Sequence, residues 1–379
     1  MSVSVRTSKE KINQAGYCLS GKISKVSRNK ANDLLNYFRS IHQQPMALFR
    51  HLIDRKLNKL KIEALVSQRL KRRPSIVKKL KIEKNMSLSR MQDIGGLRVV
   101  VDTINEVNSV RDEIRKVEKH GSFKFTFVNE KNYIKNSLSS GYRSIHLIYK
   151  YDKGIEIEKQ CRVEVQIRTK LQHSWATAVE VVGTYLGQAL KQSRGDDKYL
   201  DIFKDIGKLF QELEVGKIEY KSIEKVKQDI EKIELLNKLR SFNIVADHIS
   251  NSTKGQYILL KMDFKQRSVE IIQYSKAKFK QANAYYLKME IDNLNNGAVE
   301  IVLISIQDIK KLEQSYPNYF MDTTEFIKNL EKLFESAETM QKLKNRINNS
   351  KKEKEKIALN QMFDNIFKNT LGLFDGSKK

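Results

Sequence analysis

The stretch RVEVQIRT, residues 162–169, carries two patterns that together indicate the fold. Apolar and polar residues alternate along it, and this period of two is typical of a β-strand with one buried face. Its apolar residues are Val163, Val165 and Ile167, and its polar residues are Glu164, Gln166 and Arg168. The polar set is compatible with an ordinary half-exposed strand, and also with a ligand site on the open face of a sheet.

Other segments around this strand show similar alternation. Three are predicted to be strands: GLRVVVD (96–102), FKFTFVN (123–129) and SIHLIYKY (144–151). Apolar residues recur at helical spacing from Asn32 to about Lys71, and again over residues 104–120 and 170–190. Strands interleaved with helices predict an α+β domain with a mixed, mostly antiparallel sheet flanked by helices.

The chain divides into five predicted parts. Residues 1–30 are a basic N-terminal extension with little periodicity, which we expect to be loose. The α+β domain spans residues 31–192, and charged helices over residues 193–237 connect it to the second half. Residues 238–335 are predicted to form a smaller α/β module, followed by a lysine-rich helical tail over residues 336–379.

The composition limits the class of protein. A formal net charge of +26 predicts attraction to polyanions, although generic surface lysines would account for much of the excess. We find neither an apolar run long enough for a membrane span nor a signal peptide in the first residues, so no membrane contact is expected. Cys18 and Cys161 stand far apart, which excludes a disulfide scaffold and a cysteine-rich zinc site and indicates a cytoplasmic protein.

Cationic residues gather around the start of a predicted helix at Pro74. They are Arg69, Lys71, Arg72, Lys78 and Lys79, within the segment SQRLKRRPSIVKKLKI (67–82). A helix N-terminus already favours phosphate, so this segment is suited to a phosphorylated ligand. Taken alone, it is also compatible with a solvated basic face.

Two carboxylates are candidates for a metal site. Asp93 stands just before one predicted strand, and Glu164 lies within another. Mg²⁺ prefers one or two carboxylates together with phosphate oxygens of the substrate. We therefore expect Asp93 and Glu164 to converge on one Mg²⁺ ion.

These blocks together resemble the RelA/SpoT-type alarmone synthetase domain over about residues 35–190. The ATP-site pattern R-x-K-x-x-x-S-I-x-x-K is matched by Arg69, Lys71, Ser75, Ile76 and Lys79. The other matches are Asp93 with Arg98, the loop G-Y-x-S-I-H at 141–146, the strand at 163–169, and His173, Trp175 and Ala176. Five blocks in the family's order make the resemblance specific, although no single block would.

The resemblance implies a nucleotidyltransferase-like fold and transfer of the β,γ-diphosphate of ATP to a nucleotide 3′-hydroxyl. In that family pattern the ATP-binding residues correspond to Arg69, Lys71, Ser75, Lys79 and Arg98. Asp93 and Glu164 would hold Mg²⁺, and Glu164 would also accept the hydroxyl proton. The acceptor-binding residues would be Tyr142, Arg143, His146, Gln166 and Arg168. Tyr142 would stack on the acceptor base, and Gly141 would let the backbone turn tightly against the ligand. Arg143 and His146 would bind acceptor phosphates or hold the loop, and Ser75 could cap its helix instead of contacting ATP.

Two departures from the family pattern narrow the activity. Glu180 is followed by Val181, where many members have a histidine, so any role of that histidine is absent or taken over. No histidine in the chain precedes an aspartate, so the His-Asp mark of the family's hydrolase domain is missing. We therefore expect synthesis without degradation.

The acceptor is left open by the sequence. GTP or GDP would give the alarmone (p)ppGpp, as in the stringent response. Alternatively, the layout resembles the fused toxin–antitoxin type called CapRel, which modifies the tRNA 3′ end until translation stops in antiphage defence. In that type a Y-x-x-Y element of a regulatory module covers the ATP site until a phage protein displaces it, and SYPNYF supplies Tyr316 and Tyr319 at this spacing. A third hypothesis is an inactive RNA-binding regulatory module; the oligomeric state stays open.

Overall fold

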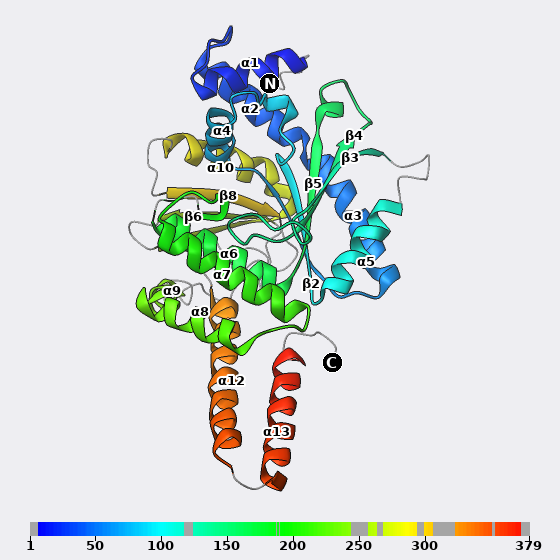
Figure 1. Cartoon of the computed structure of the whole chain (residues 1–379). Coiled ribbons are helices and arrows are strands. Elements are labelled where there is room, and N and C mark those ends of the chain that lie inside the picture. Colours follow the sequence, from blue (N-terminus) through cyan, green and yellow to red (C-terminus); the bar gives the residue numbers. More distant parts are fainter. Residues whose placement is uncertain are drawn as a thin grey trace.

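The computed structural model describes residues 7–116, 124–186, 188, 190–243, 257–263, 268–293, 299–305, 323–350 and 353–372. A five-stranded sheet with its helices occupies the upper part of the molecule in Figure 1. A three-stranded sheet lies beside it, and a stack of helices lies below, ending in a projecting helical hairpin. Among these residues, none of the helices is both long and apolar enough to cross a membrane.

The large sheet has the strand order β1-β2-β5-β4-β3. Its strands are β1 (Leu65–Leu70), β2 (Gly95–Val101), β3 (Phe125–Asn132), β4 (Ile145–Tyr151) and β5 (Arg162–Thr169). Only β2 and β5 pair in parallel, and the other neighbours are antiparallel. The predicted α+β class with a mixed, mostly antiparallel sheet is confirmed.

Strand β1 corrects one sequence prediction, because its residues fall in the stretch expected to be helical. Helix α3 (Gln43–Leu60) ends at Lys61, whose φ is +54°, and the chain then turns back along β2. The pairing of β1 with β2 overrides a three- to four-residue apolar spacing that suits a helix as well.

One face of the sheet is the core of the domain. Val163, Val165 and Ile167 pack there against α3 and α5 (Ile104–Arg115), as the alternation of β5 predicts. Phe49 of α3 meets Tyr149 of β4 in this core, with ring centroids 4.8 Å apart. The polar residues of β5 therefore point to the other face, which α6 (Lys170–Tyr185) partly covers.

Residues 7–30 form helices that pack on the α+β domain, so over these residues the predicted loose extension is wrong. Ser8 caps α1 (Lys9–Ser20) by accepting the backbone N–H of Lys11 at 3.3 Å. The apolar residues of α1, including Ile12 and Leu19, pack against α2 (Arg28–Ile41) and α4 (Arg73–Ile82). The apolar residues of α1 recur at helical spacing, which is what allows this packing. The polar and basic composition of the segment hides this spacing in the sequence.

The predicted connecting helices belong to a stack that includes α6. Its other members are α7 (Asp197–Glu214), α8 (Tyr220–Lys232), α9 (Leu235–Asn243) and the first half of α12 (Thr324–Asn349). Helix α12 continues through residue 335, the predicted boundary between the small module and the helical tail. Its second half forms the projecting hairpin with α13 (Glu353–Gly372).

The second sheet is fully antiparallel, with the order β7-β6-β8. Its elements are β6 (Tyr257–Asp263), β7 (Ser268–Tyr274) and β8 (Val299–Ser305), and α10 (Phe279–Asp292) packs on it. These elements lie within residues 238–335, where a smaller α/β module was predicted. Strand β8 lies next to β1, at the edge of the large sheet. Tyr316 and Tyr319 lie outside the described residues.

Candidate active site

A cavity of about 530 Å³, here called the main cavity, lies on the polar face of the large sheet. It is lined from β1, α4, β4, β5, α6 and the segment after α6. Nine residues predicted for the site line it: Arg69, Lys71, Ser75, Lys79, Asp93, Tyr142, His146, Glu164 and Gln166. Residues up to 97 positions apart in sequence therefore converge, as the site hypothesis requires.

Asp93 lies between two lysines. Its carboxylate accepts hydrogen bonds from Lys71 Nζ at 2.8 Å and from Lys79 Nζ at 3.1 Å. Burial raises the pKa of Asp93, but the two ammonium groups outweigh it and hold the pKa below its usual value. Asp93 is thus an ionised carboxylate placed among cations that are suited to phosphate.

Glu164 begins a chain of hydrogen bonds. Its carboxylate accepts from Gln166 Nε2 at 2.8 Å and lies 3.1 Å from His146 Nδ1. His146 Nε2 lies 2.8 Å from the hydroxyl of Tyr142, so a neutral His146 with its proton on Nδ1 satisfies both partners. Burial opposes the charge of Glu164, but His146, Gln166 and Lys71 together lower its pKa well below the usual value.

Two carboxylates in one cavity fit a magnesium site. Asp93 and Glu164 both line the main cavity, and the charge of Glu164 raises the pKa of Asp93. The described residues contain no cluster of three or more His, Cys, Asp or Glu side chains that could hold a metal by themselves. Asp93 and Glu164 would therefore supply two ligands and leave the others to phosphate and water, as Mg²⁺ prefers.

Tyr142 is buried, and a lysine covers its ring. Its side chain is only 3% exposed, and Lys191 Nζ lies 4.9 Å from the ring centroid. Lys191 also donates to Glu180 at 2.5 Å, and both residues line the main cavity. Burial lowers the pKa of Lys191 to about 8, although Glu180 opposes the shift. In this structure an acceptor base cannot stack on Tyr142 unless Lys191 moves.

Gly141 adopts a left-handed conformation with φ of +88°, as a tight turn requires. A Cβ at this position would lie 3.1 Å from Lys204 Cα and from Phe203 O of α7. Glycine is therefore needed both for the turn and for close packing of the loop on α7, and the approach of its backbone to a ligand stays a prediction.

Three of the predicted arginines do not line the main cavity. Arg143 pairs with Glu214 of α7, which also accepts from Gln172 Nε2 at 3.1 Å. Arg168 is buried next to His173, and desolvation together with nearby Arg98 lowers its pKa to about 9. Arg143 and Arg168 thus hold the loop and α6 in place, and the structure does not present them to an acceptor. Arg98 is also buried.

Glu180 and Lys191 are among the cavity residues that sequence reasoning missed, together with Glu83, Lys131, Tyr133 and Gln188. Glu180 was noted only for the residue that follows it, and Lys191 lies in the short 3₁₀ helix η4 (Leu190–Gln192) after α6. Glu180 lies on α6 and Lys191 on η4, so the periodicity of a single helix does not bring the two charges together. Only the turn of the chain after α6 brings them together.

Comparison with known proteins agrees with this geometry. Residues 68–187 match the family model described as "Region found in RelA / SpoT proteins". The chain carries a RelA/SpoT region. Over 91 residues it is 36% identical to GTP pyrophosphokinase YjbM of Bacillus subtilis, covering 24% of this chain and 41% of that protein. The chain spans less than half the length of the first curated relatives that it matches.

Solved structures with some likeness include small alarmone synthetases. This chain is 21% identical to small alarmone synthetase 1 of Bacillus subtilis bound to its product pppGpp, with a TM-score of 0.40 and coverage of 51% of this chain and 96% of that one. A GTP pyrophosphokinase family protein of Streptococcus pneumoniae is 23% identical, with a TM-score of 0.38 and coverage of 53% and 96%.

Proposed function

We propose that this protein is an ATP-dependent pyrophosphokinase that transfers the β,γ-diphosphate of ATP to the 3′-hydroxyl of GTP or GDP. The observation that carries the proposal is the convergence of Asp93 and Glu164 with Lys71 and Lys79 in one cavity of a RelA/SpoT region. Carboxylates for a metal and cations for phosphates are the parts that phosphoryl-type transfer needs.

The donor is held by charge. Arg69, Lys71 and Lys79 neutralise the triphosphate, and the lysines turn from Asp93 to phosphate oxygens when ATP enters. Asp93 and Glu164 would hold Mg²⁺, which would add to the neutralisation of the phosphate oxygens. Ser75 lies in the first turn of α4, where backbone N–H groups also favour phosphate.

The reaction is an in-line substitution at the β-phosphorus. The acceptor 3′-oxygen forms a bond to this phosphorus, the bond to the α,β-bridging oxygen breaks, and AMP leaves with the electron pair. The proton of the 3′-hydroxyl passes to Glu164. The hydrogen bonds from His146 and Gln166 orient this carboxylate and keep it ionised, so positioning is their contribution.

A second candidate acceptor is the tRNA 3′ end, as in the CapRel-type hypothesis. The net charge of +26 and the small module packed beside β1 favour it. A polynucleotide needs a cationic track outside the cavity, and phosphate contacts supply most of its non-specific affinity. Inhibition by Tyr316 and Tyr319 and release by a phage protein stay predictions of this alternative.

One labelling experiment separates the candidates. The purified protein is incubated with ATP labelled in its β- and γ-phosphates, Mg²⁺, and either GDP and GTP or deacylated tRNA. Label on the guanosine nucleotide supports the proposal, and label on the tRNA 3′ end supports the alternative. Absence of transfer to any acceptor, with the protein folded, contradicts the proposal. The self-inhibited alternative also expects no transfer, so the assay is then repeated with Tyr319→Ala, and absence of transfer in this variant too leaves the inactive RNA-binding module.

A further inference from the structure

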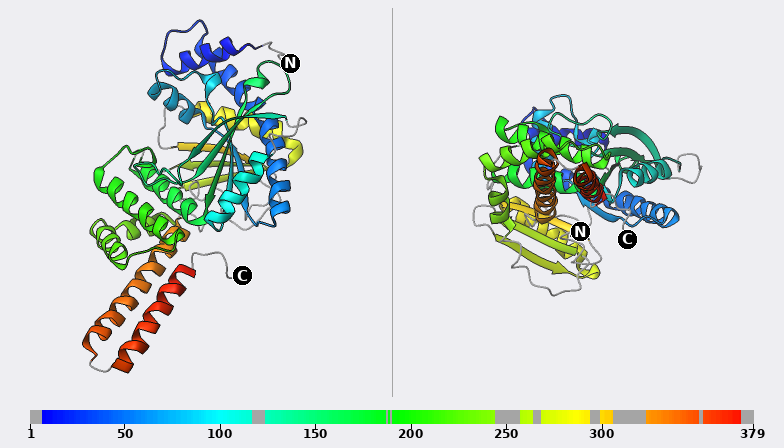
Figure 2. Two further views of the ribbon diagram at one scale, coloured as in Figure 1. Left: turned by 45° about the vertical axis from the view of Figure 1, so that its right-hand side comes forward. Right: turned by 60° about the horizontal axis from the view of Figure 1, so that its bottom comes forward.

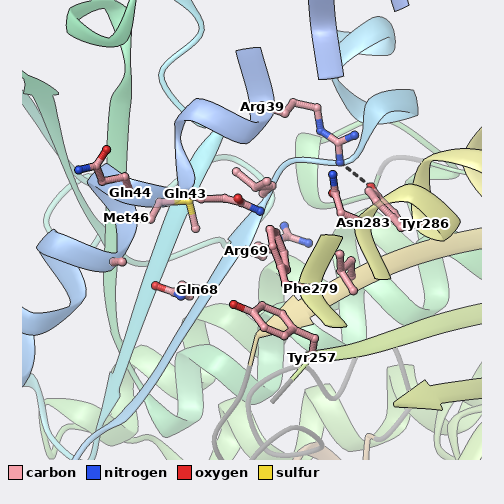
Figure 3. Close-up of a pocket in the computed structure, with 13 residues that line it drawn as sticks. Arg39, Gln43, Gln44, Met46, Gln68, Arg69, Tyr257, Phe279, Asn283 and Tyr286 are labelled. Atoms are coloured by element: carbon pink, nitrogen blue, oxygen red, sulfur yellow. Dashed lines mark hydrogen bonds between the residues drawn. The ribbon is translucent and has the colours of Figure 1, made fainter. Parts of the chain in front are cut away.

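Glu290 of α10 is the centre of a buried polar network that joins the small module to the α+β domain. Its Oε2 accepts a hydrogen bond from Arg39 of α2 at 3.0 Å, and its Oε1 accepts from the hydroxyl of Tyr286 at 2.6 Å. Arg39 also donates to this hydroxyl at 2.5 Å, beside a cavity of about 310 Å³ between β1 and the module (Figure 3). None of the three residues is more than 8% exposed. The network therefore fixes α10 on α2 away from water.

The same carboxylate reaches the start of α4. Its Oε1 also accepts the backbone N–H of Arg73, the first residue of this helix, at 3.4 Å. The N-cap residue Arg72 provides no side-chain cap, and Pro74 has no N–H group. A helix end needs acceptors for its free N–H groups, and a side chain close in sequence usually supplies them. Here Glu290 supplies one from the small module.

Helix α4 has two faces with different surroundings. Ile76 and Leu80 pack in the core that α4 shares with α1 and α2. Ser75 and Lys79 line the main cavity, on the face that we assign to the phosphates of the donor. The hydrogen bond from Arg73 to the module thus lies at the start of the turn that carries Ser75 to the cavity. If this turn frays, Ser75 and its backbone N–H leave the place where phosphate would bind.

We propose that Glu290 is a positioning residue for the donor phosphates, so that the small module supports the candidate active site. Glu290 does not line the main cavity and acts through the first turn of α4. A turn that is held before the ligand enters lowers the cost of ordering it on binding. This inference rests on the proposed function, since it assigns a support to the same phosphate site.

The direction of the effect separates this role from inhibition by the module. If contact with the module only inhibited the site, weakening the contact at Glu290 would release the site and strengthen binding of the donor. If Glu290 supports α4, the same change weakens binding of phosphates. The expected inhibition by Tyr316 and Tyr319 is a separate prediction, because it concerns other residues.

The test separates the hydrogen bond to α4 from the stability of the buried network. Both test variants carry Arg39→Met, which removes the charge that Glu290 neutralises, and they differ only at position 290. In Arg39→Met/Glu290→Gln the amide oxygen can still accept from the N–H of Arg73. In Arg39→Met/Glu290→Leu the side chain has no acceptor. Inorganic tripolyphosphate is titrated with Mg²⁺ into each full-length variant by calorimetry, and ATP is titrated in the same way.

The leucine variant should bind tripolyphosphate about 2- to 30-fold more weakly than the glutamine variant. This range corresponds to the about 0.5–2 kcal/mol that an N-terminal cap contributes to a helix. ATP should weaken by the same factor, because the change acts on the phosphates that the two ligands share. Glu270→Ala is the matched control, since it removes an exposed carboxylate of the same module that pairs with Lys261. It should leave both affinities unchanged.

Each result bears on the inference. Thermal unfolding shows which variants are folded at the titration temperature, and Glu290→Met replaces Glu290→Leu if leucine does not fit. Equal tripolyphosphate affinity in the two folded double variants overturns the inference. Tighter binding in the leucine variant also overturns it, because the group at position 290 would then compete with phosphate. Both results leave the proposed function intact. If the unmodified protein binds neither tripolyphosphate nor ATP, the proposed function fails, and this inference fails with it.

Discussion

Glu290 of α10 accepts a hydrogen bond from the backbone N–H of Arg73 in the first turn of α4, at 3.4 Å and across 217 residues of sequence. Arg72, the N-cap residue of α4, provides no side-chain cap. A carboxylate from the small module therefore satisfies one free N–H group and complements the helix dipole. Because α4 also carries Lys79 into the main cavity, the module and the candidate active site are physically connected.

Replacing Glu290 should destabilise the contact between the module and the α+β domain. In Glu290→Ala the buried Arg39 loses its counter-ion, and removing one partner of a buried ion pair costs about 3–5 kcal/mol. Denaturant unfolding followed by circular dichroism measures the change. Glu270→Ala is the control. Glu270 of β7 forms an exposed ion pair with Lys261 of β6, within the small module, and such pairs contribute about 0–1 kcal/mol.

The double variant Arg39→Met/Glu290→Leu tests the physical cause. Replacing both charges with apolar groups of similar size removes the uncompensated charge, so much of the lost stability should return. If the double variant is no more stable than Glu290→Ala, the buried charge is not the reason for the loss.

The sequence predicted the elements whose local pattern and tertiary setting agree. Alternation located β2, β4 and β5, and it placed Glu164 and Gln166 on the open face of the sheet. Strand β1 was missed because its pairing with β2 is a tertiary interaction, and its spacing suits a helix equally.

In the candidate site, too, residues that belong to a local pattern were predicted, and contacts made by distant parts of the chain were not. Residues fixed by a short pattern, such as Lys71 and Lys79, were found. Arg143 was assigned to the acceptor because its loop matches the family pattern, but its partner, Glu214, lies 71 residues away. A sequence pattern does not show which of its polar residues a distant helix will neutralise.

Glu164→Gln should abolish diphosphate transfer while the protein stays folded. The substitution keeps the shape of the side chain but removes the charge that would bind Mg²⁺ and accept the hydroxyl proton. We expect a loss of at least about 100-fold in kcat, typical of a lost general base. The labelling assay measures turnover, and Glu156→Gln, on an exposed carboxylate, is the control. Turnover at the unmodified rate would remove the role assigned to Glu164.

His42 should make the protein sensitive to mild acid. It is fully buried, its Nδ1 lies 2.7 Å from Phe38 O, and its Nε2 has no hydrogen-bond partner among the described residues. Burial lowers the pKa of His42 to about 4. Between the ordinary pKa of about 6.5 and this value, the unfolded chain binds a proton that the folded chain does not. Stability is therefore lost as the pH falls from about 6.5 to 4, by about 3 kcal/mol.

The contribution of His42 is isolated by comparison with His42→Gln, which does not titrate in this range. Denaturant midpoints at pH 7 and pH 5 should differ less in this variant than in the unmodified protein. His51→Gln, on an exposed histidine of α3, should keep the full acid sensitivity. An unchanged pH dependence in His42→Gln would show that other groups cause the loss.

Lys191 should compete with the acceptor base for the ring of Tyr142. Its ammonium group lies over this ring, and a partly desolvated cation–π contact is worth about 0.5–2 kcal/mol. Lys191→Ala uncovers the ring, so guanosine, which has no phosphates, should bind about 2- to 30-fold more tightly. In the unmodified protein the affinity should rise as the pH passes about 8, because the neutral amine is held less strongly by Glu180 and Tyr142.

The control for Lys191 is Lys198→Ala, which removes a similar contact with Tyr199, 5.3 Å from that ring's centroid, outside the main cavity. It should change neither the affinity nor its pH dependence. Titration of guanosine by calorimetry between pH 7 and 9 measures both. Weaker binding in Lys191→Ala would mean that the lysine holds the acceptor, so that the acceptor base reaches the main cavity without displacing it from Tyr142.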